Sequence, residues 1–277
     1  MKHFFTTIII ASFILPSVAQ EDVDQATIRC YYRFSQKKKT GETAVQDTMT
    51  LDIGSQMSRY YDGSKLQRDS AFRSILHNLR PESITSVSIL KNVNPNSPPA
   101  RSSGNTHKNS AYDGISEQIF KNRKNGNIVM LNVSTEPYKG TDPVGVLDWT
   151  ISPETIDFLD YTCQKATLKF RGRNYEAWFT PQIPINDGPW KFFGLPGLIL
   201  KVRDTEGLFD FECIGLENLN TPYTVEIPKG TYFECNRKDY NNVVSKIGGG
   251  QSINISGGDV IISNFIADTS FLQIELD

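Results

Sequence analysis

The sequence contains few of the residues and patterns that mark metal, nucleotide or nucleic-acid sites. Its three histidines lack H-E-x-x-H or H-x-H spacing, so no histidine-based metal site is expected. The G-x-S-x-G elbow, the phosphate-binding loop and the dinucleotide fingerprint are all missing. The formal net charge is −2, and the basic residues form no stripe along the sequence. We therefore predict no metal, no cofactor and no nucleic-acid partner.

Long hydrophobic runs are also missing, apart from one near the N-terminus. Residues 4–15 are nearly all apolar and follow Lys2, and Pro16 ends this run. Ser17-Val18-Ala19 then supplies the small residues that signal peptidase requires. Residues 1–19 are thus predicted to be a signal peptide cleaved before Gln20. Because no run is long enough to span a bilayer, we expect an exported, soluble protein in the periplasm or outside the cell.

Cysteine is scarce, with four residues at Cys30, Cys163, Cys213 and Cys235. An even number of cysteines in an exported chain predicts two disulfides, and three connectivities are open. We favour the pair Cys213 and Cys235, because they are nearest in the sequence. None of the four shows C-x-x-C spacing, which argues against a thiolate zinc site. Oxidised cysteines would also be unable to act as nucleophiles.

Alternation of apolar and polar residues dominates what is present. Residues 28–34 and 49–53 alternate with a period of two, which is typical of strands with one face on a core and one in water. Another strand is predicted at residues 128–133, joined to residues 119–120 by an Asn-Gly hairpin at residues 124–126. The chain is therefore predicted to be rich in antiparallel β-structure.

Two segments have helical spacing instead. Apolar residues at 72, 75, 76 and 79 lie on one helix face, and residues 240–247 repeat this spacing. Residues 92–111 are rich in Asn, Ser, Pro and Gly, which predicts a flexible surface loop. The strands before this loop are too few to close a core alone. We therefore predict one domain over residues 20–277.

The region from Trp149 to Glu217 carries the strongest local signal. Residues 168–170 and 175–179 form a predicted hairpin, and a proline-rich, aromatic loop follows before the strand at residues 198–202. Gly194, Pro196 and Gly197 belong to a predicted structural turn within this loop. The order Leu-Pro-Gly-Leu predicts a type II turn in which Gly197 has positive φ.

Residues 194–199 read GLPGLI, within the string YEAWFTPQIPINDGPWKFFGLPGLILKVRD at residues 175–204, and YTCQKATLKFRGR precedes it. This string resembles the GLPGLI family, exported proteins of Bacteroidetes that take their name from the motif. The resemblance covers about residues 146–217. It implies an exported protein with a central β-architecture. It assigns no catalytic residue, because the family is uncharacterised.

Two interpretations of this loop are open. In the structural one, its glycines allow close backbone packing and its prolines stiffen a crossing of the sheet. In the functional one, the loop forms the rim of a binding cleft, since loops on a rigid scaffold often carry function. The residues of this hypothetical rim are Trp178, Trp190 and Phe192, with Arg171 and Arg173 as fixed charges beside it.

The expected fold is mainly β, a curved antiparallel sheet or partly open barrel with one or two packed helices. The W-F-T-P spacing with its return strand also resembles the half-barrel of periplasmic lipoprotein carriers and sigma-factor regulators, which implies a concave apolar face. We therefore expect a non-catalytic binding or accessory protein for a lipid, a peptide or an outer-membrane component.

The alternative is a hydrolase that uses carboxylates on envelope polymers or peptides. Asp210 and Glu212 project to one strand face, and a solvated strand face is the favoured explanation of this pair. Two acids from distant strands would leave no local pattern in the sequence.

Overall fold

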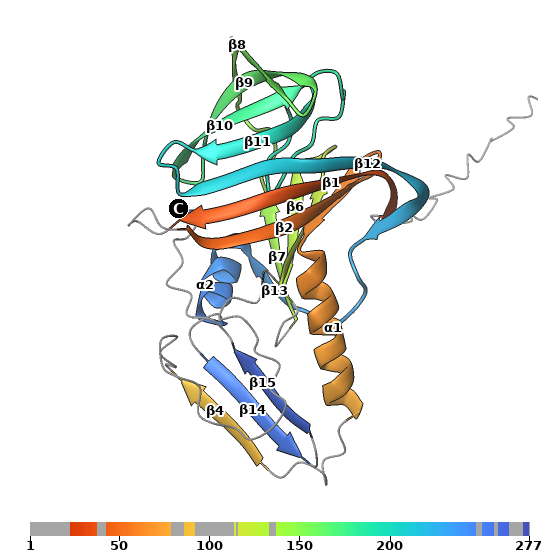
Figure 1. Ribbon diagram of the computed structural model, residues 1–277, viewed down its shortest axis with the longest axis vertical. Helices are drawn as coiled ribbons and strands as arrows, with labels where there is room; N and C mark the ends of the chain where they lie inside the picture. The colour runs from red at the N-terminus through yellow and green to blue at the C-terminus, as the bar shows by residue number, and fades with distance from the viewer. Residues whose placement is uncertain are drawn as a thin grey trace, which may run out of the picture.

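A single large sheet of twelve strands dominates the computed structural model (Figure 1). The structure describes residues 23–37, 43–78, 86–91, 114, 116–132, 137–247, 251–257, 260–265 and 274–276. In spatial order the strands are β13 (Phe233–Asn236), β7 (Tyr138–Pro143), β6 (Asn127–Asn132), β5 (Glu117–Asn122), β3 (Met57–Tyr61), β2 (Thr43–Ile53), β1 (Val23–Lys37), β12 (Phe209–Glu226), β11 (Leu198–Asp204), β10 (Arg173–Thr180), β9 (Tyr161–Phe170) and β8 (Thr150–Phe158).

The sheet is open and mixed. Neighbouring strands pair antiparallel except β13 and β7, which are parallel. The prediction of a mainly β fold is confirmed, and the sheet does not close into a barrel. A second, three-stranded sheet has the order β15 (Val260–Phe265), β14 (Gln251–Gly257), β4 (Ser86–Lys91).

Both predicted helices are confirmed, as α1 (Gly63–Asn78) and α2 (Arg237–Ile247). Each begins at an N-cap that its sequence supplies. The Asp62 carboxylate accepts the N–H of Lys65 at 2.8 Å, and the Asn236 side-chain oxygen accepts the N–H of Asp239 at 3.0 Å. Within the described part of the chain, neither helix has the length and apolarity needed to cross a membrane. The predicted signal peptide and the predicted loop at residues 92–111 lie outside the described residues.

Each strand sends alternate side chains to opposite faces of the large sheet. In β1, Cys30, Tyr32 and Phe34 are buried on what we call the core face, whereas Arg29 and Arg33 point to the other side, the second face. A smaller apolar cluster lies on the second face and contains Ala26, Met57, Phe120, Leu131 and Val225.

A bulge lets β1 serve both clusters. The pairing with β12 shifts between Ala26 and Ile28, and Ala26 belongs to the second-face cluster while Ile28 packs on the core face. The extra residues of this irregularity lie on β12, whose pairing residue changes from Tyr223 to Asn218. The N-terminal and C-terminal halves of this long strand therefore contribute to different cores.

The β9–β10 hairpin has a two-residue turn at Arg171-Gly172. Both residues have positive φ, 50° and 78°, which are the signs of a type I′ turn. This hairpin confirms the predicted one, with pairing from Arg173 and Phe170 outward. The predicted Asn-Gly hairpin between β5 and β6 is also confirmed, with Gly126 at φ 70°.

Candidate functional site

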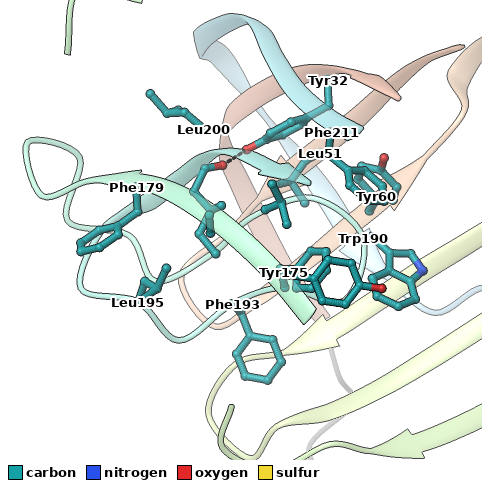
Figure 2. Close-up of a cluster of buried hydrophobic side chains, with 14 of the residues drawn as sticks. Tyr32, Leu51, Tyr60, Tyr175, Phe179, Trp190, Phe193, Leu195, Leu200 and Phe211 are labelled. Carbon is teal, nitrogen blue, oxygen red and sulfur yellow. Dashed lines mark hydrogen bonds between the residues drawn. The ribbon is translucent and has the colours of Figure 1, made fainter. Parts of the chain in front are cut away.

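The loop at residues 181–197 fills the core face of the curved end of the sheet (Figure 2). Trp190 and Phe192 are 5% and 0% exposed, and their rings lie 5.1 Å apart between centroids. Phe192 also contacts the ring of Tyr175 on β10, with centroids 4.8 Å apart. The apolar face on which the sequence predicted a ligand is thus occupied by the chain's own loop.

An ion pair cluster fastens the first half of this loop to β5. Asp187, which is fully buried, pairs with Lys121 at 2.5 Å and with the guanidinium of Arg123 at 2.5 Å. Lys121 also donates to the carbonyl of Gly188, and Arg123 donates to the carbonyl of Gly54 at 2.6 Å. Burial alone would raise the pKa of Asp187, but the two cations hold it below its ordinary value.

A second cluster fastens the other half of the loop. The ammonium of Lys191, itself buried, lies 3.0 Å from the Asp142 carboxylate on β7 and 2.5 Å from the Glu275 carboxylate. Arg171 pairs with Asp142, and Arg237 on α2 pairs with Glu275 at 2.7 Å. Burial acts to raise the pKa of Glu275, but the cations, Lys191 first, lower it overall. These groups bring together β7, the β9–β10 turn, the loop, α2 and the C-terminal segment.

Glu117 on β5 borders this second cluster and has an unusual acidity. Burial and the charge of Glu275 raise its pKa to about 7, while Lys191 and the hydroxyl of Tyr240 act in the opposite direction. A carboxyl group with such a pKa can hold or release a proton near neutral pH. The cluster therefore contains one group able to act as an acid or a base.

The second face of the sheet carries a cavity of about 240 Å³ beside the β5–β6 hairpin. Met57, Phe120 and Val129 form its apolar floor, and Ile227 flanks it. Side chains with amide groups line the hairpin side, namely Asn122, Asn125 and Asn127. Asp142 also lines the cavity, but its carboxylate is buried and paired with Arg171 and Lys191. The cavity therefore combines an apolar floor with neutral amide groups and one carboxylate that is already paired.

The structure separates the residues of the predicted rim. Trp178 is half-buried on the second face, where the Lys165 ammonium lies 5.9 Å from its ring, whereas Trp190 and Phe192 are buried on the core face. A rim requires exposed side chains, which Trp190 and Phe192 do not provide. Ligand binding by Trp178 stays a prediction.

Arg171 and Arg173, predicted as charges beside the rim, have partners within the chain, and ligand binding by them stays a prediction. Arg171 pairs with Asp142, and Arg173, which is 6% exposed, donates to the carbonyl of Ile274 at 3.1 Å. Both arginines therefore bind other parts of the chain.

The predicted type II turn is wrong. The φ of Gly197 lies outside the left-handed region, and its N–H donates to the carbonyl of Leu195 at 2.8 Å, closing a three-residue turn around Pro196. Gly197 is needed for another reason, because an added Cβ would overlap the carbonyl of Thr180. The positive φ of this motif belongs to Gly194, at 94°.

The predicted disulfides are not formed. All four cysteines are described and all are free thiols. The favoured pair is separated in the sheet, because Cys213 lies on β12 and Cys235 on β13, with β7, β6, β5, β3, β2 and β1 between them. Burial raises the pKa of Cys163 and Cys213 to about 11, so both thiols stay protonated at neutral pH.

The strand carboxylates Asp210 and Glu212 lie on the second face among basic residues. Glu212 pairs with Arg33 and, at 2.7 Å, with Lys201. The contacts of Glu212 are cross-strand ion pairs. Burial raises the pKa of Asp210.

Sequence reasoning missed the buried ions that hold the loop. Lys121 occupies a core-face position two residues after Ile119, and Lys191 stands between Trp190 and Phe192. A charged residue inside an apolar pattern was the available signal. Its partner, Asp187 or Glu275, is distant in the sequence, and only the fold identifies it.

These features define a β-rich class of protein, an open sheet whose core face is closed by an ion-anchored internal loop. A model of a protein family of unknown function, described as Porph_ging, matches residues 170–201, which include β10 and this loop. No curated protein matches the chain at a significant level.

Two solved structures of PNGF-II, in different space groups, are similar to this chain. Both are 15% identical and cover 80% of the chain, with TM-scores of 0.49 and 0.51. The chain spans about a third of the length of PNGF-II, since it covers 33% of that chain. At 15% identity, the PNGF-II structure with a TM-score of 0.51 shows a similar fold and nothing further.

Proposed function

We propose that this chain is an exported, non-catalytic binding protein, and that its ligand enters the cavity on the second face. The cavity carries this proposal, because the core face is filled by the loop while the second face keeps an open space of about 240 Å³. A site of this size accommodates a small ligand group, not a large cofactor.

The lining indicates a neutral ligand, and we infer a short peptide segment of an envelope protein. An asparagine side chain offers one carbonyl oxygen and two N–H donors, which match the donor and acceptor of a peptide group. Asn125 is positioned by its own hairpin, since its side-chain oxygen accepts the N–H of Asn127 at 2.9 Å. Phe120 and Met57 would then contact an apolar side chain of the ligand.

Filling the cavity tests this function. Wild-type protein and a Val129→Trp variant would be immobilised and exposed to envelope fractions, and the bound peptides, lipids and glycans identified by mass spectrometry. Peptides that bind the wild type and are lost from the variant, at an unchanged melting temperature, would support the proposal. Ile214→Trp is the matched control, because Ile214 is already exposed and does not line the cavity. Equal capture by all three proteins would refute it.

Export is tested separately, through the mature N-terminus. The signal-like residues 1–19 place cleavage before Gln20. N-terminal sequencing of the native protein should therefore begin at Gln20, and a chain that begins at Met1 would contradict export.

The hydrolase alternative is favoured by one observation, the raised pKa of Glu117 next to Glu275. Purified protein would be incubated with peptidoglycan and with envelope peptides, and the products separated chromatographically. Hydrolysis that is lost in Glu117→Gln would support catalysis, and identical profiles for both proteins would leave the binding function.

A further inference from the structure

The C-terminal residues 274–276 lie against the large sheet. The N–H of Leu276 donates to the carbonyl of Arg171 at 2.9 Å. In turn, the carbonyl of Ile274 accepts from the Arg173 guanidinium at 3.1 Å and from the Tyr175 hydroxyl at 3.3 Å. Backbone groups on both sides of Glu275 are therefore recognised, which fixes the direction of the segment.

Between these two contacts the Glu275 side chain enters a site built from two elements, the loop and α2. Its carboxylate contacts Lys191 of the loop at 2.5 Å, and Arg237 and Asn241 of α2, each at 2.7 Å. Glu275 is 5% exposed, so this is a desolvated carboxylate with its oxygens satisfied.

Among the residues named at this site, positive charges outnumber negative ones when Glu275 is left out. Lys191, Arg171 and Arg237 bring three positive charges, and Asp142 brings one negative charge. Without Glu275, Lys191 would share Asp142 with Arg171 in a buried setting, which is costly. Glu275 also raises the pKa of the neighbouring Glu117, because the two carboxylates repel each other.

The third residue of the segment is also accommodated. Leu276 lies over the β9–β10 turn, and a Cβ added to Gly172 would lie 2.7 Å from the Cβ of Leu276. Leu276 itself remains 59% exposed, so its neighbours cover one side of it. Recognition thus combines two backbone contacts, one buried carboxylate and one apolar contact.

We propose that Lys191, Arg237, Asn241, Arg171, Arg173 and Tyr175 form a recognition site for an apolar-Glu-apolar peptide. Residues 274–276 fill this site in their own chain, and the same residues of a second copy can fill it in exchange. The partners of the segment, from Arg171 to Asn241, lie 34 or more positions away from the residues that they contact. The contacts therefore do not require that segment and site belong to one chain. Exchange of an identical element between copies is a low-cost route to a dimer.

The first test uses the synthetic peptide of residues 270–277, SFLQIELD, with a fluorescent label, and the full-length chain. Glu275→Gln and Leu276→Ala each weaken the internal contact, and Leu276→Ala keeps the buried charges intact. Both variants should bind the peptide at least tenfold more tightly than the wild type does, by fluorescence anisotropy. A peptide with Gln at the Glu position should bind at least tenfold more weakly. Glu234→Gln, which removes an exposed carboxylate, is the control and should bind as the wild type does.

The second test is the mass of the wild-type protein in solution, by light scattering across a range of concentrations. A dimer should form as concentration rises, and excess SFLQIELD peptide should return it to monomer. The recognition site would be overturned if the Glu275→Gln and Leu276→Ala variants are folded but bind no peptide. It would also be overturned if they bind the Gln peptide as tightly as SFLQIELD. A wild type that stays monomeric at every concentration would overturn the exchange.

Discussion

At the scale of single residues, buried charged side chains determine how the loop at residues 181–197 is held, more than the aromatic residues that stand out in the sequence. Asp187 shows this, because two cations satisfy it inside an otherwise apolar core. Such a cluster adds less net stability than its short distances imply, since desolvation opposes the attraction. Removing one member is costly, because its partners remain buried without their counter-charge.

Asp187→Asn should therefore lower the free energy of unfolding by about 3–5 kcal/mol. It leaves Lys121 and Arg123 buried beside a neutral amide. Urea denaturation measures the change. Glu176→Gln is the control, since it breaks exposed pairs with Lys165 and Arg203 and should cost less than about 1 kcal/mol. Similar losses in both variants would contradict this account of the loop.

The two glycines of the motif should respond differently to alanine. Gly197→Ala places a Cβ against the Thr180 carbonyl, which the backbone must move to avoid, at a cost of about 1–3 kcal/mol. Gly194→Ala meets open space but keeps a positive φ of 94°, which costs about 1–2 kcal/mol. Thermal unfolding should therefore rank Gly197→Ala as at least as damaging as Gly194→Ala. The reverse order would show that the backbone at Gly197 can relax away from the Thr180 carbonyl at little cost.

At the scale of elements, the docking of α2 depends on one close approach to β7. Tyr240 is fully buried and its ring covers Gly140, where a Cβ would lie 2.7 Å from the ring. Arg237 and Asn241, on neighbouring turns of the helix, hold Glu275. The position of α2 thus links the sheet to the C-terminal segment.

Gly140→Ala should displace α2 and lower the free energy of unfolding by about 1–3 kcal/mol. Because α2 carries Arg237, hydrogen exchange should also become faster in both α2 and residues 274–276. Gly230→Ala is the matched control, since its Cβ would make an ordinary contact of 3.5 Å with Tyr232. Unchanged exchange in residues 274–276 would show that the helix and the segment are not coupled.

At the scale of the whole molecule, buried carboxyl groups make stability depend on pH in two opposite ways. Glu117 favours the folded state at low pH, whereas Asp187 and Glu275 favour it at higher pH. The pKa of Glu117 is raised to about 7, so the folded protein holds a proton that the unfolded chain releases near the ordinary value of 4.5. Its contribution is present below about pH 4.5 and is lost as pH rises through 7. Asp187 and Glu275 have lowered pKa values, so their contribution is lost as pH falls below their ordinary values.

Glu117→Gln should therefore flatten the stability profile between about pH 5 and 8 and raise the free energy of unfolding at pH 8, by roughly 1–3 kcal/mol. Glutamine keeps the size of the side chain and cannot ionise. Urea denaturation at several pH values measures both profiles. If the free energies of unfolding of wild type and variant change in parallel between about pH 5 and 8, Glu117 does not titrate near pH 7.

Local sequence determined the elements of this protein. Alternation placed β1, β2 and the β9–β10 and β5–β6 hairpins, and apolar spacing placed α1 and α2, because these patterns act over a few residues. The same alternation set which side chains lie together on one face of a strand, as Cys30 and Tyr32 show.

Only the tertiary structure decided what covers each face. Trp190 and Phe192 were predicted at a rim, but the fold turns their loop inward, where apolar burial is largest. The ion partners needed the fold as well, since Lys121 meets Asp187 across 66 positions and Lys191 meets Glu275 across 84. A charge buried next to apolar neighbours reveals that a partner must exist, but contacts between distant segments carry no local pattern. The sequence therefore determined the strands and helices, and packing selected which distant charges meet.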